Sequence, residues 1–108
     1  MLESNLEGRL KREVGKLGGM AAKWTSPGLS GVPDRVVLLP GGQTIFVEMK
    51  SPGKPLRPLQ AKRKKELEAL GFRVYKLDSI SSIDQFIQEV SHEIQSASLS
   101  GIRHTTNT

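Results

Sequence analysis

Apolar residues at the start of the chain recur with the period of an α-helix. The positions are Leu2, Leu6, Leu10, Val14 and Leu17. Because Gly18-Gly19 follows them, we predict an amphipathic helix that ends at this glycine pair. At about 100° per residue, Glu3 falls inside the apolar stripe and Glu7 at its edge. Core-directed carboxylates would indicate a metal or water-organising role, whereas carboxylates at the stripe margin reach solvent, and the sequence leaves both readings open.

The next part of the chain alternates strand-forming runs with turns. Residues 20–24 are predicted to form a strand, and a Ser/Pro/Gly loop over 25–32 leads from it to the following run. Two further apolar runs, 34–39 and 44–50, flank a turn at 40–43 that contains two glycines. Such an arrangement predicts an antiparallel hairpin.

The second half of the chain predicts a helix, a strand and a last helix. The first helix covers 59–70, with Gly71 after it, and the strand covers 72–77. The expected core stripe of the helix 59–70 consists of Leu56, Leu59, Leu67 and Leu70. An amphipathic pattern continues to about residue 95, and the Ser/Thr/Asn/Gly-rich remainder, 96–108, is expected to be a mobile polar tail. The fold predicted for 1–95 is one α/β domain, a mixed sheet of about four strands flanked by helices.

The register of the predicted hairpin brings charged side chains together at its open end. With the turn centred between its two glycines, Asp34 lies opposite Met49 and diagonal to both Glu48 and Lys50. Side chains alternate faces along a strand, so Glu48 and Lys50 share one face. We therefore expect two carboxylates and one ammonium to converge within roughly 5–8 Å of one another.

This grouping has the chemistry of a phosphate-hydrolysing metal site. Carboxylate oxygens are preferred ligands of Mg²⁺, so Asp34 and Glu48 are candidate ligands. A metal bound there can polarise a phosphoryl oxygen and lower the pKa of a bound water. Lys50 can position that water or neutralise charge on the phosphate. An ordinary salt bridge at a strand end is the simpler alternative, but Glu and Lys are disfavoured in strands otherwise made of Val, Ile and Phe.

Composition narrows the possible functions. The net charge is +5 and the pI is about 9.8, which suits a polyanionic partner. The chain has no cysteine, which excludes disulfides, thiolate metal sites and cysteine nucleophiles. No apolar run approaches the ~20 residues needed to span a bilayer, and the polar N-terminus is not a signal peptide, so we expect a cytoplasmic protein without membrane contact. His92 and His104 have no second ligand at metal-binding spacing, and we interpret both as non-catalytic.

Basic and polar residues near the predicted acid pair are candidates for contact with DNA. They are Lys23, Ser26, Lys54, Arg57, Lys62, Lys64 and Lys65. Basic runs on a helix are usually a solvated face, so phosphate contact and simple solvation are both open for the last three. Trp24 could stack on a base. A lone Trp beside a core strand is more often part of the packing, and the sequence favours that interpretation.

Several short motifs resemble, in order and spacing, the virus-type replication-repair nuclease (VRR-NUC) domain of the PD-(D/E)xK nuclease superfamily. The motifs are Gly31-Val-Pro-Asp-Arg35, Leu39-Pro-Gly-Gly42, Phe46-Val-Glu-Met-Lys50, Leu59-Gln60 and Leu70-Gly-Phe-Arg-Val-Tyr75. The likeness covers about Glu3 to Asp78 and is greatest to small stand-alone phage and bacterial members. It implies a restriction-endonuclease-like fold and a Mg²⁺- or Mn²⁺-dependent nuclease.

The resemblance also implies roles for individual residues. The Met49 carbonyl would be a further metal ligand, and a glutamate of the first helix would add to the acidic cluster. We assign that role to Glu7, because Glu3 lies nearer the helix end. Gln60 lies on nearly the same face of its helix as Leu67, so its amide points inward and needs a partner. A boundary Gln in solvent is the alternative, and the resemblance favours a supporting role at the acids.

The sequence therefore predicts a metal-dependent DNA nuclease with Asp34, Glu48, Lys50, Glu7 and Gln60 at its active site. The resemblance further implies a homodimer that acts on branched DNA such as four-way junctions. The last helix is a candidate interface, although its apolar face could equally pack on its own domain. The rival hypothesis is a non-catalytic nucleic-acid-binding module with the same fold, which would be expected to have lost cluster residues.

Overall fold

The elements follow one another in the predicted order. The computed structural model describes the backbone of residues 3–105 and the side chains of residues 5–96. Its elements are α1 (Glu3–Lys16), β1 (Met20–Lys23), β2 (Arg35–Leu39), β3 (Gln43–Met49), α2 (Pro58–Ala69), β4 (Arg73–Leu77) and α3 (Ile80–Thr105). The predicted helix residue Leu2 lies outside the described residues, as does the side chain of Glu3.

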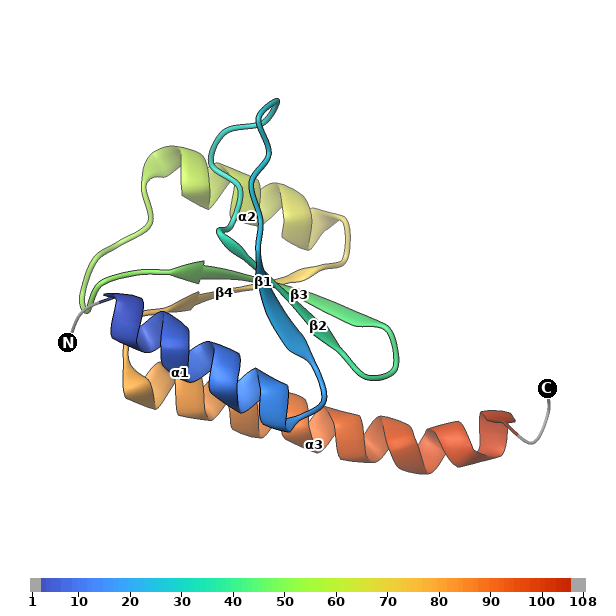
Figure 1. Cartoon of the computed structure of the whole chain (residues 1–108). Helices are drawn as coiled ribbons and strands as arrows, with labels where there is room; N and C mark the ends of the chain where they lie inside the picture. The colour runs from blue at the N-terminus through green and yellow to red at the C-terminus, as the bar shows by residue number, and fades with distance from the viewer. Residues whose placement is uncertain (1–2, 106–108) are drawn as a thin grey trace.

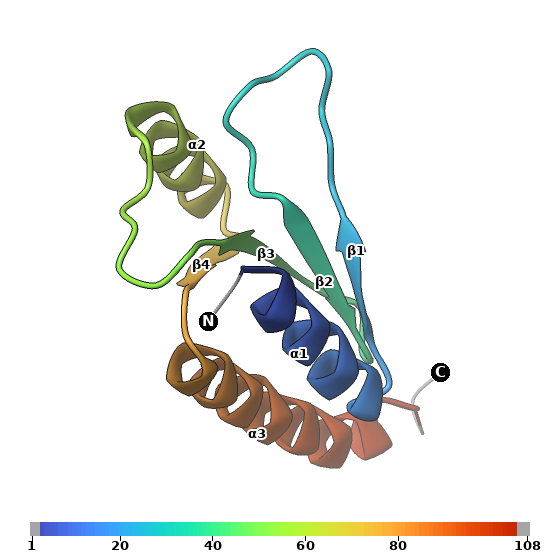
Figure 2. The same cartoon turned by 60° about the vertical axis from the view of Figure 1, so that its left-hand side comes forward.

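The four strands form one mixed sheet in the order β1-β2-β3-β4. The first three strands are antiparallel neighbours, and β4 runs parallel to β3 after the crossover through α2. Figure 1 shows α1 and α3 on one face of this sheet and α2 on the other, and Figure 2 shows α1 and α3 side by side. The predicted mixed α/β architecture is therefore confirmed.

The hydrophobic core lies between the sheet and the pair α1 and α3. Its fully buried side chains include Leu6, Leu10, Val14, Val37, Ile45, Val47, Met49, Leu77, Ile83, Phe86 and Val90. The predicted stripe of α1 faces this core. The apolar face of α3 is also used here, so the hypothesis that it is free to form a dimer interface is wrong for Ile83, Phe86 and Val90.

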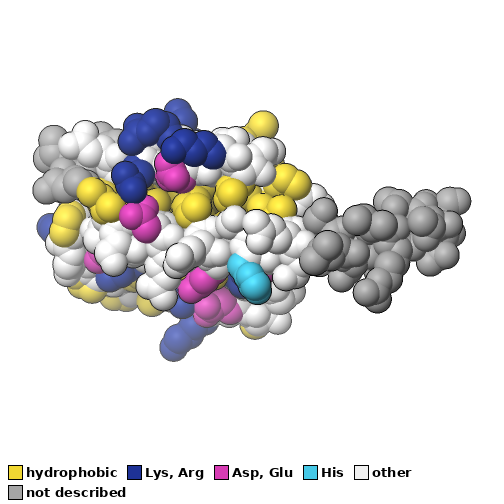
Figure 3. All heavy atoms as spheres, turned by 90° about the horizontal axis from the view of Figure 1, so that it is seen from below, with side chains coloured by type: hydrophobic (Ala, Val, Ile, Leu, Met, Phe, Trp, Pro, Cys, Tyr) yellow, Lys and Arg dark blue, Asp and Glu magenta, His cyan; other side chains and the backbone are white. Residues whose placement is uncertain are grey.

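The outer surface of α1 and α3 is polar and charged beside a strip of hydrophobic side chains (Figure 3). Arg9 of α1 donates to Asp84 of α3 at 2.9 Å and links the two helices. Both side chains are partly exposed, so this ion pair contributes little to stability compared with the core.

The helix α2 packs differently from the prediction. None of its side chains is buried, and Leu59 and Leu70 are 41% and 74% exposed. The expected core stripe is wrong because polar contacts and close backbone packing tether this helix to the rest of the domain. The Arg63 Nε donates to the Ser30 carbonyl at 2.7 Å, and a Cβ on Gly31 would come within 2.7 Å of Leu59.

Because α2 covers only part of its face of the sheet, apolar side chains remain exposed there. Met20 pairs with Leu38, and Leu38 pairs with Thr44. In the parallel pair of β3 and β4, Ile45 pairs with Arg73, so the preceding residues, Thr44 and Phe72, are also neighbours. Phe72 therefore continues the row beyond Thr44. Met20, Leu38 and Phe72 are 60%, 40% and 39% exposed.

The last helix continues further than the sequence predicted. It reaches Thr105 instead of ending near residue 95, so the backbone of 96–105 is helical. Figure 1 shows this part extending beyond the sheet. The segment contains one glycine and no proline, so its polar composition does not prevent helix formation. The domain boundary at 95 and the mobility of 96–108 stay predictions. No described helix is long and apolar enough to cross a membrane.

Candidate active site

The β2–β3 hairpin sets a register that differs by one residue from the prediction. Leu39 pairs with Gln43, so Pro40, Gly41 and Gly42 form the connection. Both glycines adopt positive φ, 86° and 78°, a conformation that glycine reaches without strain. The centre of the hairpin therefore moves to Gly41.

This register places Asp34 opposite Glu48, and not opposite Met49 as predicted. Arg35 pairs with Val47, so the next residues outward, Asp34 and Glu48, face each other. Directly opposed side chains lie on the same face of a sheet and are closer than diagonal ones. The observed register thus puts both carboxylates on one face of the sheet, whereas the predicted register would put Asp34 on the face of Met49, opposite to Glu48.

The Glu48 carboxylate is buried beneath the start of α2. Glu48 is 7% exposed, and its Oε2 accepts a hydrogen bond from the Gln60 Nε2 at 3.3 Å. The Gln60 Oε1 in turn accepts from the Arg57 backbone N–H at 2.9 Å, which caps the helix. The cap fixes the amide so that its nitrogen is directed at Glu48. Gln60 therefore points inward and contacts the acid pair.

Asp34 is partly buried, and burial is the main reason why its pKa is raised above the ordinary value. The negative charge of Glu7 also raises this pKa, while the Met49 backbone N–H and the Arg35 guanidinium lower it. The Met49 N–H donates to the Asp34 Oδ1 at 2.9 Å. The carboxyl is thus held in place at the end of the hairpin, in surroundings that a bound cation would make more favourable.

Arg35 is a buried cation beside the acids that the sequence analysis missed. It is 5% exposed, and its Nη1 donates to the Ala21 carbonyl at 3.0 Å. Its Nη2 lies 3.7 Å from the Glu7 Oε1, and its Nε has no hydrogen-bond partner among the described residues. The sequence signal that could have identified it is the position of this charged residue at the start of the apolar run after Asp34. Glu7 therefore lies near enough to interact with both this guanidinium and Asp34.

A pocket of about 430 Å³ opens beside Glu48. It is lined by Glu48, Met49, Lys50, Ser51, Lys54, Pro55, Arg57 and Gln60. The structure thus brings Lys50, Lys54 and Arg57 to one hollow with the buried acid. These three cations give the pocket a polar rim suited to an anionic ligand.

Lys76 is a second residue that the sequence analysis missed at this site. It pairs with Glu48 across β3 and β4, so it lies in the same row as the acids. Its Nζ donates to the Lys54 carbonyl at 3.2 Å, and the Asp78 Oδ2 accepts from the Gly53 N–H at 3.3 Å. Lys76 and Asp78 thereby tie the loop after β3 to β4. The sequence does not show this role, because Lys76 comes next to Glu48 only when β4 pairs with β3.

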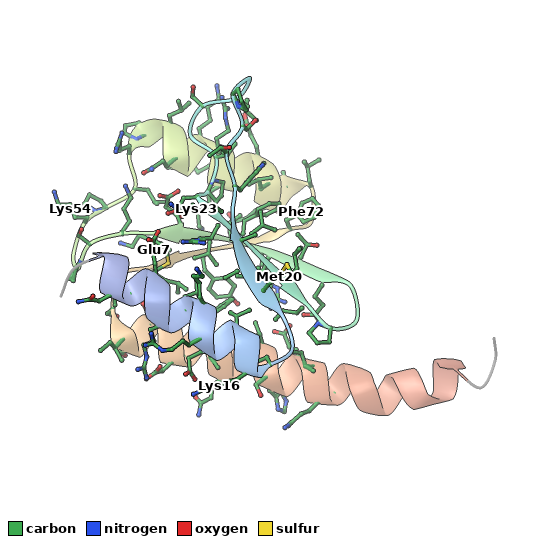
Figure 4. All side chains as sticks on the ribbon, in the orientation of Figure 1. Glu7, Lys16, Met20, Lys23, Lys54 and Phe72 are labelled. Carbon is green, nitrogen blue, oxygen red and sulfur yellow. The ribbon has the colours of Figure 1, made fainter. Side chains whose placement is uncertain are left out.

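The predicted DNA-contacting residues lie on several separate elements. Figure 4 shows Glu7 on α1 near the strand ends, Lys23 on β1 and Lys54 on the loop after β3. Lys62 and Lys65 are exposed and share a shallow hollow on α2. Lys64 is partly buried and pairs with Glu68 at 3.1 Å. Ser26 is partly exposed in the loop after β1.

The possible metal donors are two carboxylates and a backbone oxygen. No group of three or more His, Cys, Asp or Glu side chains in the described part of the chain is arranged to hold a metal. Continuing the hairpin register one step past Asp34 places Pro33 opposite Met49. Because proline has no N–H, β2 offers no ladder donor to the Met49 carbonyl. Oxygen donors of this kind suit a hard divalent cation, so the residues present fit such an ion.

The raised pKa of Asp34 predicts how stability depends on pH in metal-free protein. Because folding raises this pKa, ionisation of Asp34 favours the unfolded state. This loss of folding stability is absent well below about pH 3.9, where the carboxyl is protonated in both the folded and the unfolded state. It is complete at pH values above the raised pKa of the folded protein. Asp34→Asn should therefore raise the melting temperature at pH 7 in EDTA, and this gain should vanish at low pH. An equal change in melting temperature at both pH values would contradict the prediction.

Comparison with known proteins shows the family to which the chain belongs. No protein-family model matches the sequence. The chain is 51% identical over 83 residues to "Putative nuclease p44" of Acyrthosiphon pisum secondary endosymbiont phage 1, a match that covers 75% of this chain and 89% of that protein. A solved structure described as "VRR_NUC domain" superposes with a TM-score of 0.75 and 30% identity, over 80% of this chain and 94% of the other. The chain therefore belongs to the VRR-NUC nuclease family.

Proposed function

We propose that the chain is a Mg²⁺- or Mn²⁺-dependent endonuclease that hydrolyses phosphodiester bonds of DNA at the Asp34–Glu48 pair. The observation that carries this proposal is the opposition of two carboxylates in one register position, beside a pocket rimmed by basic side chains. Asp34 is held by the Met49 N–H and Glu48 by Gln60. Carboxylate oxygens held in place in this way favour a role in metal-assisted hydrolysis over the alternative of a structural salt bridge.

The proposed metal ligands are Asp34, Glu48 and the carbonyl of Met49. When bound, the ion would act as a Lewis acid and lower the pKa of a coordinated water. Asp34 and Glu48 are the anionic donors, and the missing ladder donor at Pro33 leaves the Met49 carbonyl oxygen open from the β2 side.

The remaining site residues hold charge and position groups around the scissile phosphate. Lys50 lines the pocket and would orient the attacking water or neutralise charge on the phosphate. The Gln60 amide fixes the orientation of the Glu48 carboxylate. Glu7 adds negative charge beside Asp34, and Arg35 offsets part of that charge.

The proposed DNA contacts surround this pocket. Lys54 and Arg57 would bind the phosphates nearest the cut, because they line the pocket itself. The more distant proposed contacts are Lys23, Ser26, Lys62, Lys64 and Lys65. Contacts of this kind neutralise phosphates and give affinity without sequence preference.

We further propose that the active species is a homodimer that cuts branched DNA such as four-way junctions. One domain has one acid pair, whereas resolving a junction requires two cuts. A two-fold dimer supplies two equivalent sites from one sequence. Because the apolar face of α3 is occupied by the core, the exposed apolar row of Met20, Leu38 and Phe72 is the more suitable surface for a second copy.

The first prediction for this function concerns the acid pair and Lys50. Asp34→Ala, Glu48→Ala and Lys50→Ala should each reduce cleavage of labelled DNA by on the order of 10³-fold or more, and double variants should lose little further activity. Calorimetric titration should show weaker Mg²⁺ or Mn²⁺ binding after loss of either carboxylate and unchanged binding after loss of Lys50. The matched control is Lys16→Ala, since Lys16 lies away from the site on α1 (Figure 4). Full cleavage by Lys50→Ala would refute its assigned role.

The second prediction concerns the exposed basic run of α2. A Lys62→Ala, Lys64→Ala, Lys65→Ala triple variant should bind duplex DNA more weakly and with a shallower salt dependence. Each phosphate contact that is lost should reduce the log–log slope by about 0.9. The measurement is fluorescence anisotropy over a salt series in EDTA, with Lys16→Ala as the control. An unchanged slope would mean that the run is only a solvated face.

The third prediction concerns the dimer. Sedimentation equilibrium at micromolar protein should give twice the monomer mass, and a four-way junction should be cut faster than a linear duplex of the same sequence. Leu38→Glu should lower the dimer mass fraction and junction cleavage together, because it places a charge in the exposed apolar row. A wild-type monomer that cuts junctions with first-order dependence on protein concentration would contradict the dimer.

A further inference from the structure

Trp24 extends the row of side chains that contains the acid pair. The Trp24 N–H donates to the Asp34 carbonyl at 2.9 Å, one residue beyond the last β1–β2 pair, Lys23 and Arg35. Trp24 therefore lies opposite Asp34, just as Asp34 lies opposite Glu48. Opposed residues share a face, so the Trp24 backbone lies about one strand spacing, roughly 4.8 Å, from that of Asp34, and its side chain lies on the acid-bearing face.

The indole of Trp24 is supported from below by a buried aromatic ring. Its centroid lies 5.0 Å from that of Phe46, with 34° between the planes, and Phe46 meets Phe72 edge-on at 5.3 Å. Phe46 is only 9% exposed, whereas Trp24 keeps part of its surface accessible. An aromatic side chain held in this way is preorganised, because little side-chain freedom remains to be lost on binding.

The chain around Trp24 is compatible with a nucleic-acid backbone. Lys23 precedes it and is exposed, and the loop residues 25–31 carry no acidic side chain. The far end of this loop is tied to α2 by the bond from Arg63 to the Ser30 carbonyl. A close approach of Gly31 to Leu59 adds to this connection. The loop is thus non-acidic and is tied to α2 at its far end.

We propose that Trp24 stacks on the base of a nucleotide adjacent to the scissile phosphate and so positions the DNA strand at the acid pair. The proposal rests on the proposed nuclease function, which places the phosphate at Asp34 and Glu48. A base on the β1 side of that phosphate is then within reach of the supported indole. Because every base has a π-face, this contact would fix the strand without selecting its sequence.

The first experiment uses the fluorescence of Trp24, which is the only tryptophan in the chain. Wild-type protein in EDTA, where the proposed cleavage does not occur, is titrated with an oligonucleotide of mixed sequence. Stacking predicts saturable quenching of the indole emission. In a series of oligonucleotides that carry one abasic residue at successive positions, a single position next to the cleavage site should lose both the quenching and part of the affinity.

The second experiment compares variants of Trp24 with a control outside the cluster of Trp24, Phe46 and Phe72. Trp24→Leu keeps apolar contact with Phe46 but cannot stack, and should weaken binding roughly 5- to 150-fold. Trp24→Phe should restore most of that affinity. The control is Leu70→Ala, which truncates an apolar side chain that is 74% exposed after the end of α2, outside the aromatic cluster, and should bind as wild type. The abasic substitution should weaken binding of wild type but not of Trp24→Leu, since the partner of the base is already gone.

The outcomes separate this inference from the function on which it rests. If the wild type cleaves no DNA with Mg²⁺ or Mn²⁺, the proposed function fails. If it cleaves DNA but its fluorescence is insensitive to DNA and every abasic position binds alike, Trp24 is only part of the packing and this inference alone is overturned. Should Trp24→Leu fail to fold, the fluorescence and abasic series on the wild-type protein still decide the question.

Discussion

The candidate site depends on the pairing of β2 with β3. The three-residue connection over Pro40–Gly42, with both glycines at positive φ, places Asp34 and Glu48 in one register position. A slip of one residue would turn every side chain of one strand to the opposite face of the sheet. Asp34 and Glu48 would then lie on different faces, and no rearrangement of side chains could bring them together. The geometry of a distant turn thus determines the chemistry at the open end of the hairpin.

Bringing acidic side chains together at the open end of the β2–β3 hairpin lowers the stability of the fold, and neighbouring residues offset part of this loss. Burial raises the pKa of Asp34, and Glu7 raises it further. Arg35 supplies a buried positive charge, yet its Nε lacks a partner and its contact with Glu7 is long at 3.7 Å. Such incompletely satisfied groups are typical of functional sites, where stability is exchanged for reactivity. The arrangement is understandable if a cation completes it.

The sequence predicted what depends on local pattern and missed what depends on packing. The stripe of α1 and the order of helices and strands along the chain follow from periodicity, and buried Leu6 and Leu10 agree with it. The register was wrong by one residue, because a Gly-Gly pair is compatible with either a two- or a three-residue connection. Lys76 could not be predicted, since its place beside Glu48 arises only when β4 pairs with β3. The apolar positions of α2 indicated a core stripe, but tertiary contacts overrode that pattern.

The loose packing of α2 is itself consistent with a nuclease. Two helices pack on one face of the sheet, whereas α2 lies on the other with no buried side chain of its own. Its connections are directed at the site: Gln60 to Glu48, and Arg63 to the loop that follows Trp24. A helix buried by apolar contacts would close this face and exclude a polymer from the acids. A helix tethered by polar contacts leaves the acid row accessible and holds the groups that line it.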